Sequence, residues 1–169
     1  MIQNFKEDYN YPIPVVRFYF RRTMSVAVDM LKNLPQDSLI LDFGCGKQFL
    51  KKILNFKIIG YDIVPELTDI KDYKNLKPDV IFCNHVLEHL SLTELKEALD
   101  NFKKMKPKFI ITGIPTENLI SRLCASIGKP HGYFEHKTKM RTIHDELSMR
   151  FTLLERRNII TLTIISKWK

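Results

Sequence analysis

The 169-residue sequence lacks several features that would place a protein at or beyond a membrane. No run of about eighteen uncharged apolar residues occurs, so the pattern predicts no transmembrane helix. Residues 1–10 carry charge where a secretory signal peptide requires an apolar run. We therefore expect a soluble, cytoplasmic protein without an integral membrane segment.

Cysteine pairs and domain linkers are also missing. The three cysteines, Cys45, Cys83 and Cys124, are an odd number without CxxC spacing, a pattern that suggests neither a disulfide framework nor a zinc knuckle. They are predicted to be buried free thiols. No internal repeat, low-complexity tract or Gly/Ser-rich linker divides the chain, and 44% hydrophobic content supplies one sizeable core. A single domain over residues 1–169 follows.

Charge is present in excess of one sign, with a formal net charge of +8. Such a surface favours anionic partners, so nucleic acid remains a possible partner, as do phosphorylated compounds and acidic lipid. The basic residues are nevertheless scattered in short pairs that are typical of solvated helix faces and turns. The oligomeric state cannot be read from this pattern. The pairs are Arg21-Arg22, Lys51-Lys52, Lys103-Lys104 and Arg156-Arg157.

Hydrophobic periodicity predicts alternating strands and helices. A helix over residues 15–34 has apolar positions at Phe18, Val26, Met30 and Leu34, and Pro35 ends it. Near-continuous apolar runs then predict buried strands of a parallel sheet covered on both faces. The strands are expected at 38–42, 57–62, 78–83 and 108–112, and the helices at 48–55 and 91–105, the latter with a Ser91/Glu94 capping box.

The C-terminal part follows a different pattern. Thr142 is predicted to cap a short helix, after which residues 151–155 and 159–166 read as two strands. The three residues between them permit only an antiparallel pair. The predicted fold is therefore a doubly wound, mostly parallel α/β sheet of seven or six strands, Rossmann-like, with an antiparallel C-terminal hairpin at one edge.

One turn combines features suited to a cofactor. Residues 42–46, Asp-Phe-Gly-Cys-Gly, join a predicted strand to a helix, and the two glycines let the backbone approach a ligand closely. Asp62 ends the next strand, where its carboxylate is placed to accept hydrogen bonds from a pair of ribose hydroxyls. In an open α/β sheet the ligand crevice lies beyond the carboxyl ends of the strands, where the winding reverses.

Three segments together resemble the class I S-adenosylmethionine-dependent methyltransferases: residues 39–46, 60–62 and 78–90. The resemblance runs from about Leu39 to the C-terminus. It implies methyl transfer from S-adenosylmethionine to an acceptor that is a small molecule and is not identified. The transfer would be a direct in-line displacement with S-adenosylhomocysteine as product. In place of a third glycine this chain has Gln48, and the interval between Asp62 and Pro78 is too short for the usual helix and strand.

The resemblance also implies site residues. Asp42 and residues 44–46 would cradle the methionine portion, Asp62 would hold the ribose, and Asp72, after a possible short strand, would lie beside the adenine. The implied cofactor contacts are Asp42, Phe43, Gly44, Cys45, Gly46, Asp62, Ile63, Asp72, Asn84 and His85.

The acceptor side is less specified. A hydroxyl or amine acceptor must lose a proton, and histidine is the side chain best suited to take it near neutral pH. His85 and His136 are the candidate catalytic residues, with His131 a further possibility. Residues 1–36 are expected to form a helical lid, and an insert within 114–140 to cap the acceptor pocket.

Three other functions compete. Residues 85–89 spell H-x-x-E-H, which in zinc peptidases places two histidines one helical turn apart, here His85 and His89 beside Glu88. A third ligand would have to come from Glu94, Glu97 or Glu117, and residues 42–46 would have no role, so no metal site is predicted. A nicotinamide oxidoreductase would require glycine where Phe49 stands. A methyltransferase-like fold serving only to bind RNA or a protein partner is the third alternative.

Overall fold

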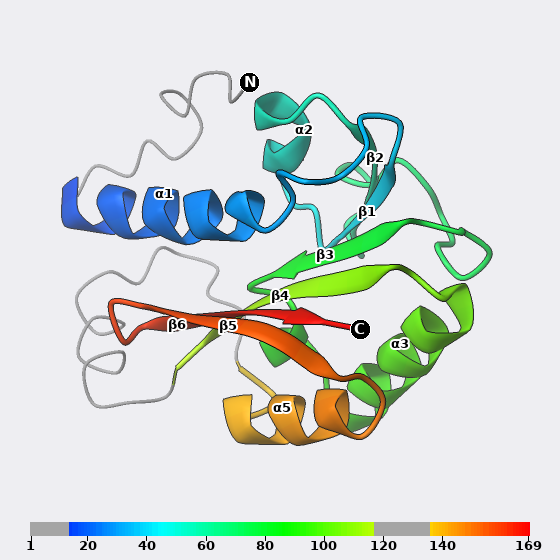
Figure 1. Cartoon of the computed structure of the whole chain (residues 1–169). Helices are drawn as coiled ribbons and strands as arrows, with labels where there is room; N and C mark the ends of the chain where they lie inside the picture. The colour runs from blue at the N-terminus through cyan, green and yellow to red at the C-terminus, as the bar shows by residue number, and fades with distance from the viewer. Residues whose placement is uncertain (1–13, 117–135) are drawn as a thin grey trace.

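The structure is a computed structural model that describes residues 14–116 and 136–169. Figure 1 shows strands and helices alternating along the first two thirds of the chain and a hairpin at its end. The elements are α1 (Pro14–Asp29), β1 (Leu39–Phe43), α2 (Phe49–Ile53), β2 (Lys57–Tyr61), β3 (Val80–Asn84), the 3₁₀ helix η1 (Leu87–His89), α3 (Leu92–Met105), β4 (Phe109–Pro115), α5 (Met140–Ser148), β5 (Leu153–Ile159) and β6 (Thr163–Trp168).

Six strands form one sheet in the order β2-β1-β3-β4-β6-β5. Strands β1 to β4 pair in parallel, and β6 pairs antiparallel with both β4 and β5. The predicted doubly wound sheet with an antiparallel hairpin at one edge is confirmed, with six strands among the described residues. The winding reverses between β1 and β3, so a ligand crevice is expected beyond the carboxyl ends of these two strands.

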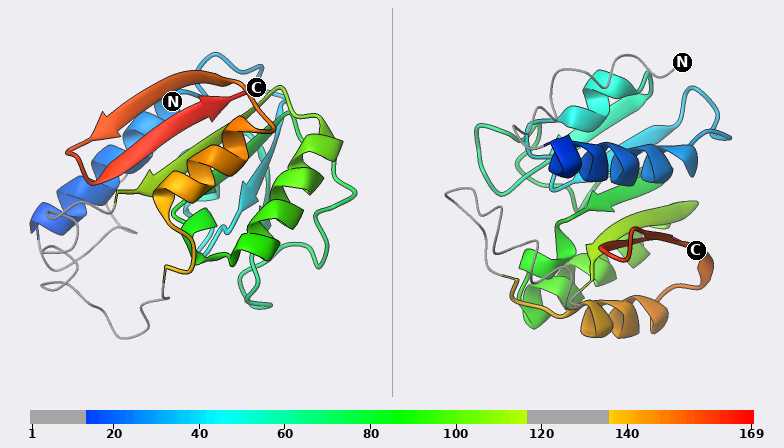
Figure 2. Two further views of the ribbon diagram at one scale, coloured as in Figure 1. Left: turned by 90° about the horizontal axis from the view of Figure 1, so that it is seen from below. Right: turned by 90° about the vertical axis from the view of Figure 1, so that its left-hand side faces the viewer.

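Helices cover both faces of the sheet. Figures 1 and 2 show α1 and α2 on one face and α3 and α5 on the other. Alternate residues of each strand supply the two cores, as the pleat requires: Leu41 and Ile81 belong to the cluster that includes Phe102 of α3, whereas Ile40 and Phe82 belong to the opposite one. Burial on both faces explains why these strands read as continuous apolar runs.

The predicted capping box of α3 is present. The Ser91 hydroxyl accepts a hydrogen bond from the Glu94 amide at 3.4 Å, and the Glu94 carboxylate accepts one from the Ser91 amide at 2.8 Å. Two amides that lack intrahelical partners are thereby satisfied. The helix begins at Leu92, shortly after η1 ends at His89.

The ends of several elements differ from the predictions. The first helix ends at Asp29 instead of Leu34, and Phe18 at its start is 62% exposed rather than part of the buried stripe. The start of α1 extends beyond the sheet in Figure 1. The possible short strand before Asp72 does not form, since residues 62–79 contain no strand.

The C-terminal elements are shifted along the chain. Thr142 does not cap α5, which starts at Met140 because Thr138 just before it is tied to the end of η1. The hairpin turn lies at residues 160–162, not at 156–158, and Ile160 and Thr161 adopt φ of 50° and 59°. Arg156 and Arg157 therefore lie within β5, an edge strand, where charged side chains discourage pairing with other chains.

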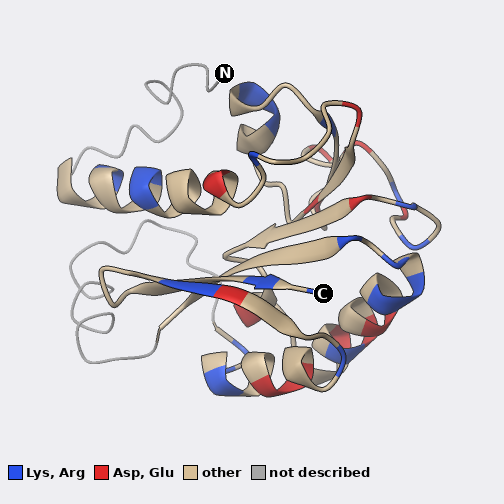
Figure 3. Cartoon of the chain, viewed as in Figure 1, with Lys and Arg blue, Asp and Glu red and all other residues tan. Residues whose placement is uncertain are grey.

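The surface agrees with a dispersed positive charge. Figure 3 shows Lys and Arg on α1, α2, α3 and β5, with acidic residues interspersed on α3. Among the described residues, no helix has the length and apolar character that a bilayer crossing requires.

Candidate cofactor site

The glycine turn after β1 is held tightly to the end of β2. The amides of Gly44 and Cys45 donate to the carbonyl oxygen of Tyr61 at 2.7 and 3.1 Å. Gly44 has φ of +74°, and a Cβ there would lie 2.2 Å from a methyl carbon of Val86. Only glycine meets both conditions, so this position packs the turn against the residues after β3.

The second glycine faces open space. Gly46 has φ of +48°, and a Cβ built there would meet no atom within 4 Å. Its amide donates to Oδ2 of Asp62 at 2.9 Å. The Gly46 backbone is thus held by its amide hydrogen bond to Asp62, while the side where a Cβ would lie is open. A cofactor lying over the turn requires this arrangement.

Asp62 organises the turn and still has acceptor capacity. Its Oδ2 receives the Gly46 amide, and its Oδ1 receives the Val64 amide at 3.0 Å. A carboxylate offers about four lone-pair sites, so two remain for hydroxyl donors. The neighbouring Ile63 is 83% exposed, an unusual state for isoleucine that an apolar ring of a ligand would relieve.

A second acid, which the sequence did not reveal, supports the same turn. Asp69 accepts from the Gly60 amide at 2.6 Å and from Gln48 Nε2 at 3.1 Å, and it forms an ion pair with Lys51. Burial alone would raise the pKa of Asp69, but the hydrogen bonds from Lys51 and from the Gly60 amide outweigh it and lower that pKa. The short interval after Asp62 therefore replaces the missing helix with a loop that fastens the glycine turn.

Asp42, at the end of β1, is an unusual carboxyl group. It is 6% exposed, and burial is the main reason that its pKa is raised from 3.8 to about 7. Lys51 opposes this shift, and the negative charges of Asp62 and Asp69 add to it. Burial likewise raises the pKa of the Cys45 thiol to about 12, so this cysteine is no nucleophile near neutral pH.

The end of β3 contributes Asn84 and His85. Asn84 Oδ1 is buried and accepts no hydrogen bond from the described residues, and its side chain occupies the space that a Cβ on Gly113 would take. His85 adopts φ of +57°, and its amide donates to the Gly113 carbonyl at 2.8 Å. Its Nε2 lies 3.4 Å from Thr163 Oγ1, which also hydrogen-bonds to Tyr19.

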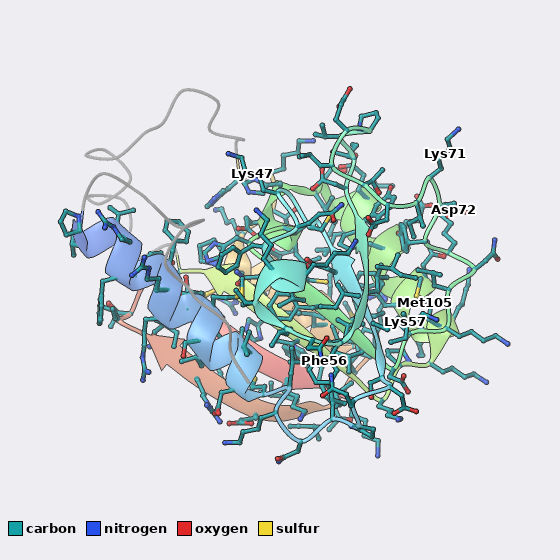
Figure 4. The ribbon with its side chains drawn as sticks, turned by 90° about the horizontal axis from the view of Figure 1, so that it is seen from above. Lys47, Phe56, Lys57, Lys71, Asp72 and Met105 are labelled. Atoms are coloured by element: carbon teal, nitrogen blue, oxygen red, sulfur yellow. The ribbon has the colours of Figure 1, made fainter. Side chains whose placement is uncertain are left out.

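Asp72 lies apart from the turn. Its Oδ1 accepts from the amide of Lys74, two residues on, at 2.9 Å, and Lys74 in turn pairs with Glu97 of α3 at 2.8 Å. Figure 4 shows Asp72 well to one side of Lys47, which follows the glycine turn. The predicted adenine contact of Asp72 remains a prediction.

The H-x-x-E-H segment does not form the regular helix that a zinc peptidase requires. The backbone of His85 has the left-handed conformation, and within this segment only residues Leu87–His89 are helical, as one 3₁₀ turn. Glu94 is engaged in the capping box and Glu97 with Lys74, so neither supplies a third ligand. Glu117 and His131 lie outside the described residues, whereas His136 packs against His89 with ring centroids 5.3 Å apart.

A cavity of about 590 Å³ lies away from this edge, between α1 and the residues that follow α2. Arg22, Asp29 and Arg157 are among its lining residues, and none of the predicted site residues lines it. The candidate site is therefore the carboxyl edge of the sheet, where the glycine turn, Asp62, Asn84 and His85 meet.

A doubly wound sheet with a glycine turn at its switch point is an arrangement found in α/β domains that bind nucleotide cofactors. A sequence model described as a methyltransferase domain matches residues 15–159. The chain belongs to this methyltransferase domain family. The predicted fold and family are thus confirmed, and neither the oxidoreductase nor the peptidase alternative gains support.

Solved structures share the fold at low sequence identity. The PH0226 protein from Pyrococcus horikoshii superposes with a TM-score of 0.70 at 13% identity, over 96% of this chain and 93% of that one. The N-methyltransferase NodS from Bradyrhizobium japonicum gives 0.67 at 18% identity, over 89% and 95%. Magnesium protoporphyrin IX methyltransferase from Synechocystis, with bound S-adenosylhomocysteine, gives 0.63 at 17%, over 92% and 86%. No curated protein sequence matches the chain significantly.

Proposed function

We propose that this protein transfers a methyl group from S-adenosylmethionine to a small-molecule acceptor bound at the carboxyl edge of the sheet. The observation that carries the proposal is the cradle made by Gly46 and Asp62, in which the backbone is anchored from behind and open in front. The family match supports the reaction type. A small-molecule acceptor is supported by the magnesium protoporphyrin IX methyltransferase among the similar structures.

The residues of the edge fit the cofactor group by group. Asp62 would accept hydrogen bonds from the two ribose hydroxyls with its remaining lone pairs, and Ile63 would pack on the adenine. Residues 44–46 would cradle the methionine portion, and Asp42 would be the carboxyl group available to its ammonium. Asn84 Oδ1, which lacks a hydrogen-bond partner among the described residues, would accept a hydrogen bond from the ligand.

The cofactor supplies an electrophilic sulfonium methyl group, so the protein has mainly to position the acceptor. Holding two reactants at attack distance contributes about 7–11 kcal/mol to catalysis. A hydroxyl or amine acceptor also needs a base, for which we propose His85. Its Nδ1 lies 3.5 Å from Glu88 Oε1, and its Nε2 end lies beside Thr163. Tyr19 and Phe20 of α1 approach the His85 ring, which supports the lid assigned to residues 1–36.

Calorimetric titration with S-adenosylhomocysteine tests the cradle. Wild-type protein is expected to bind it, and Asp62→Asn to bind at least tenfold more weakly, because about 1.4 kcal/mol of charge-assisted hydrogen bonding is lost. Asp37→Asn is the matched control, since Asp37 is exposed before β1, at the opposite edge of the sheet. Asp72→Asn, measured alongside, decides whether the predicted adenine contact exists.

Failure of wild-type protein to bind either S-adenosylmethionine or S-adenosylhomocysteine would overturn the proposal. If binding is confirmed, labelled methyl transfer to a panel of small hydroxyl and amine compounds, with RNA in parallel, identifies the acceptor class. Labelling of RNA alone would refute the small-molecule acceptor while leaving the cofactor assignment intact.

A further inference from the structure

A second group of polar side chains lies at the carboxyl edge beyond the cofactor cradle. Glu88, His89 and His136 each present one potential ligand atom, and these atoms all lie within 4.8 Å of one another. Carboxylate oxygen and imidazole nitrogen are the ligands that divalent transition metals take up in proteins. The convergence joins η1 to a residue far along the chain.

Backbone hydrogen bonds hold this convergence in place. The amides of Lys137 and Thr138 donate to the Glu88 carbonyl at 2.8 and 3.2 Å. The Thr138 hydroxyl donates to the Leu90 carbonyl at 2.6 Å, across 48 residues of sequence. His136 therefore directly precedes two residues, Lys137 and Thr138, that hydrogen-bond to η1 and the residue after it. Its ring packs against that of His89.

The Glu88 carboxylate is the independent sign that a ligand belongs here. Its side chain is 2% exposed, and neither carboxylate oxygen accepts a hydrogen bond from any described residue. The nearest cationic candidates are His85 Nδ1 at 3.5 Å and His89 Nε2 at 3.9 Å, beyond good hydrogen-bond geometry. A buried carboxylate without hydrogen bonds costs folding free energy, and a bound cation offsets that cost.

We propose that Glu88, His89 and His136 bind a single divalent transition-metal ion. The three ligand atoms need only draw together slightly, because metal–ligand distances of about 2.0–2.2 Å place neighbouring ligands roughly 3–4 Å apart. Three protein ligands leave at least one coordination position open, as in catalytic rather than structural metal sites. This ligand set differs from the peptidase pattern because His136 replaces His85.

The open position suggests a use in the reaction. A hydroxyl oxygen of the acceptor bound to the ion would be oriented at the same edge as the cofactor and would give its proton more readily to the proposed base, His85. This second step rests on the proposed function, whereas the binding of the ion does not.

Calorimetric titration of tag-free protein with Zn²⁺, and separately with Mn²⁺, tests the site. Wild-type protein is expected to bind one ion, and His136→Asn to bind at least tenfold more weakly. His136 is exposed, so its replacement is not expected to disturb folding. His144→Asn is the matched control, because His144 lies on α5 beside Trp168 and outside the cluster, and it should bind as the wild type does.

A stability measurement provides a second readout. An ion that binds only the folded state raises the melting temperature, and the rise grows with the logarithm of the ion concentration divided by its Kd. Zn²⁺ is expected to raise the melting temperature of the wild type and of His144→Asn but not that of Glu88→Gln, whose folding circular dichroism verifies. Absence of a one-to-one ion, or equal binding by His136→Asn and the wild type, overturns the proposal. Titration with S-adenosylhomocysteine on the same metal-free wild-type sample reports on the cofactor cradle separately.

Discussion

The two halves of the carboxyl edge differ in whether their buried polar side-chain atoms have hydrogen-bond partners. Around β1 and β2, residues 39–79 contain no buried side-chain nitrogen or oxygen without a hydrogen-bond partner. Around β3 and η1, Asn84 and Glu88 both have buried oxygens that no described residue satisfies. The first half is organised before any ligand arrives, whereas the second half has polar groups that a ligand would complete.

The tight contact between Gly44 and Val86 joins these halves. Gly44 belongs to the ordered turn after β1, and Val86 follows β3 directly after His85. The distance between the cradle and the candidate base therefore depends on a contact that admits no extra atom. A cofactor and an acceptor held by separate halves need such a fixed spacing.

Breaking this contact is expected to have the largest effect. Gly44→Ala places a Cβ 2.2 Å from Val86 and keeps the left-handed φ of +74°. Overpacking and backbone strain together should lower the free energy of unfolding by about 2–5 kcal/mol, measured by urea denaturation. Gly46→Ala should cost only about 1–2 kcal/mol, because open space surrounds it and strain alone remains. Equal losses in the two variants would show that the contact does not set the spacing.

Neutralising one carboxylate in each half compares them directly. Asp69→Asn removes the charge that Lys51, Gln48 and the Gly60 amide share, so it should lower the free energy of unfolding by about 1–3 kcal/mol. Because its pKa is lowered in the folded state, that contribution is present above about pH 4 and is lost as the pH falls through the folded value.

Glu88→Gln is the counterpart in the other half. At pH 8 without metal it should leave stability within about 0.5 kcal/mol or raise it, because no hydrogen bond is lost. Thermal and urea unfolding of both variants measure the difference. A greater loss for Glu88→Gln than for Asp69→Asn would reverse our comparison of the halves.

The sequence predicted the fold well because the strands and α3 carry local signals. Continuous apolar runs marked β1, β3 and β4, and Ser91 with Glu94 marked the start of α3. The ends of α1, α5 and the hairpin were placed wrongly because tertiary contacts decide them. Thr138 hydrogen-bonds to Leu90, so α5 starts before the apparent cap at Thr142. Arg157 lies in β5, where the sequence predicted a turn, and forms an ion pair with Asp29 at the end of α1.

The candidate site was predictable only where its residues follow strands directly. Asp42, Asp62 and Asn84 lie at strand ends, and periodicity places strand ends. The role of Asp69 was not predicted, because this residue belongs to an irregular loop whose path no sequence pattern encodes. The approach of His136 to Glu88 escaped because backbone hydrogen bonds between distant segments create it.

The smallest expected effect is the release of a fraction of a proton when the ligand binds. It tests whether the charge of the ligand changes the pKa of Asp42, in the half of the edge around β1 and β2. Because burial raises the pKa of Asp42 to about 7, stability contributed by the protonated form should decline as the pH rises from about 4 to about 7. At pH 7 about half of the Asp42 groups hold a proton, and an ammonium bound nearby lowers the pKa and releases it. Calorimetric titration with S-adenosylhomocysteine in Tris and in phosphate should reveal release of up to about half a proton, which Asp42→Asn abolishes. Identical binding enthalpies in both buffers would place the ammonium away from Asp42.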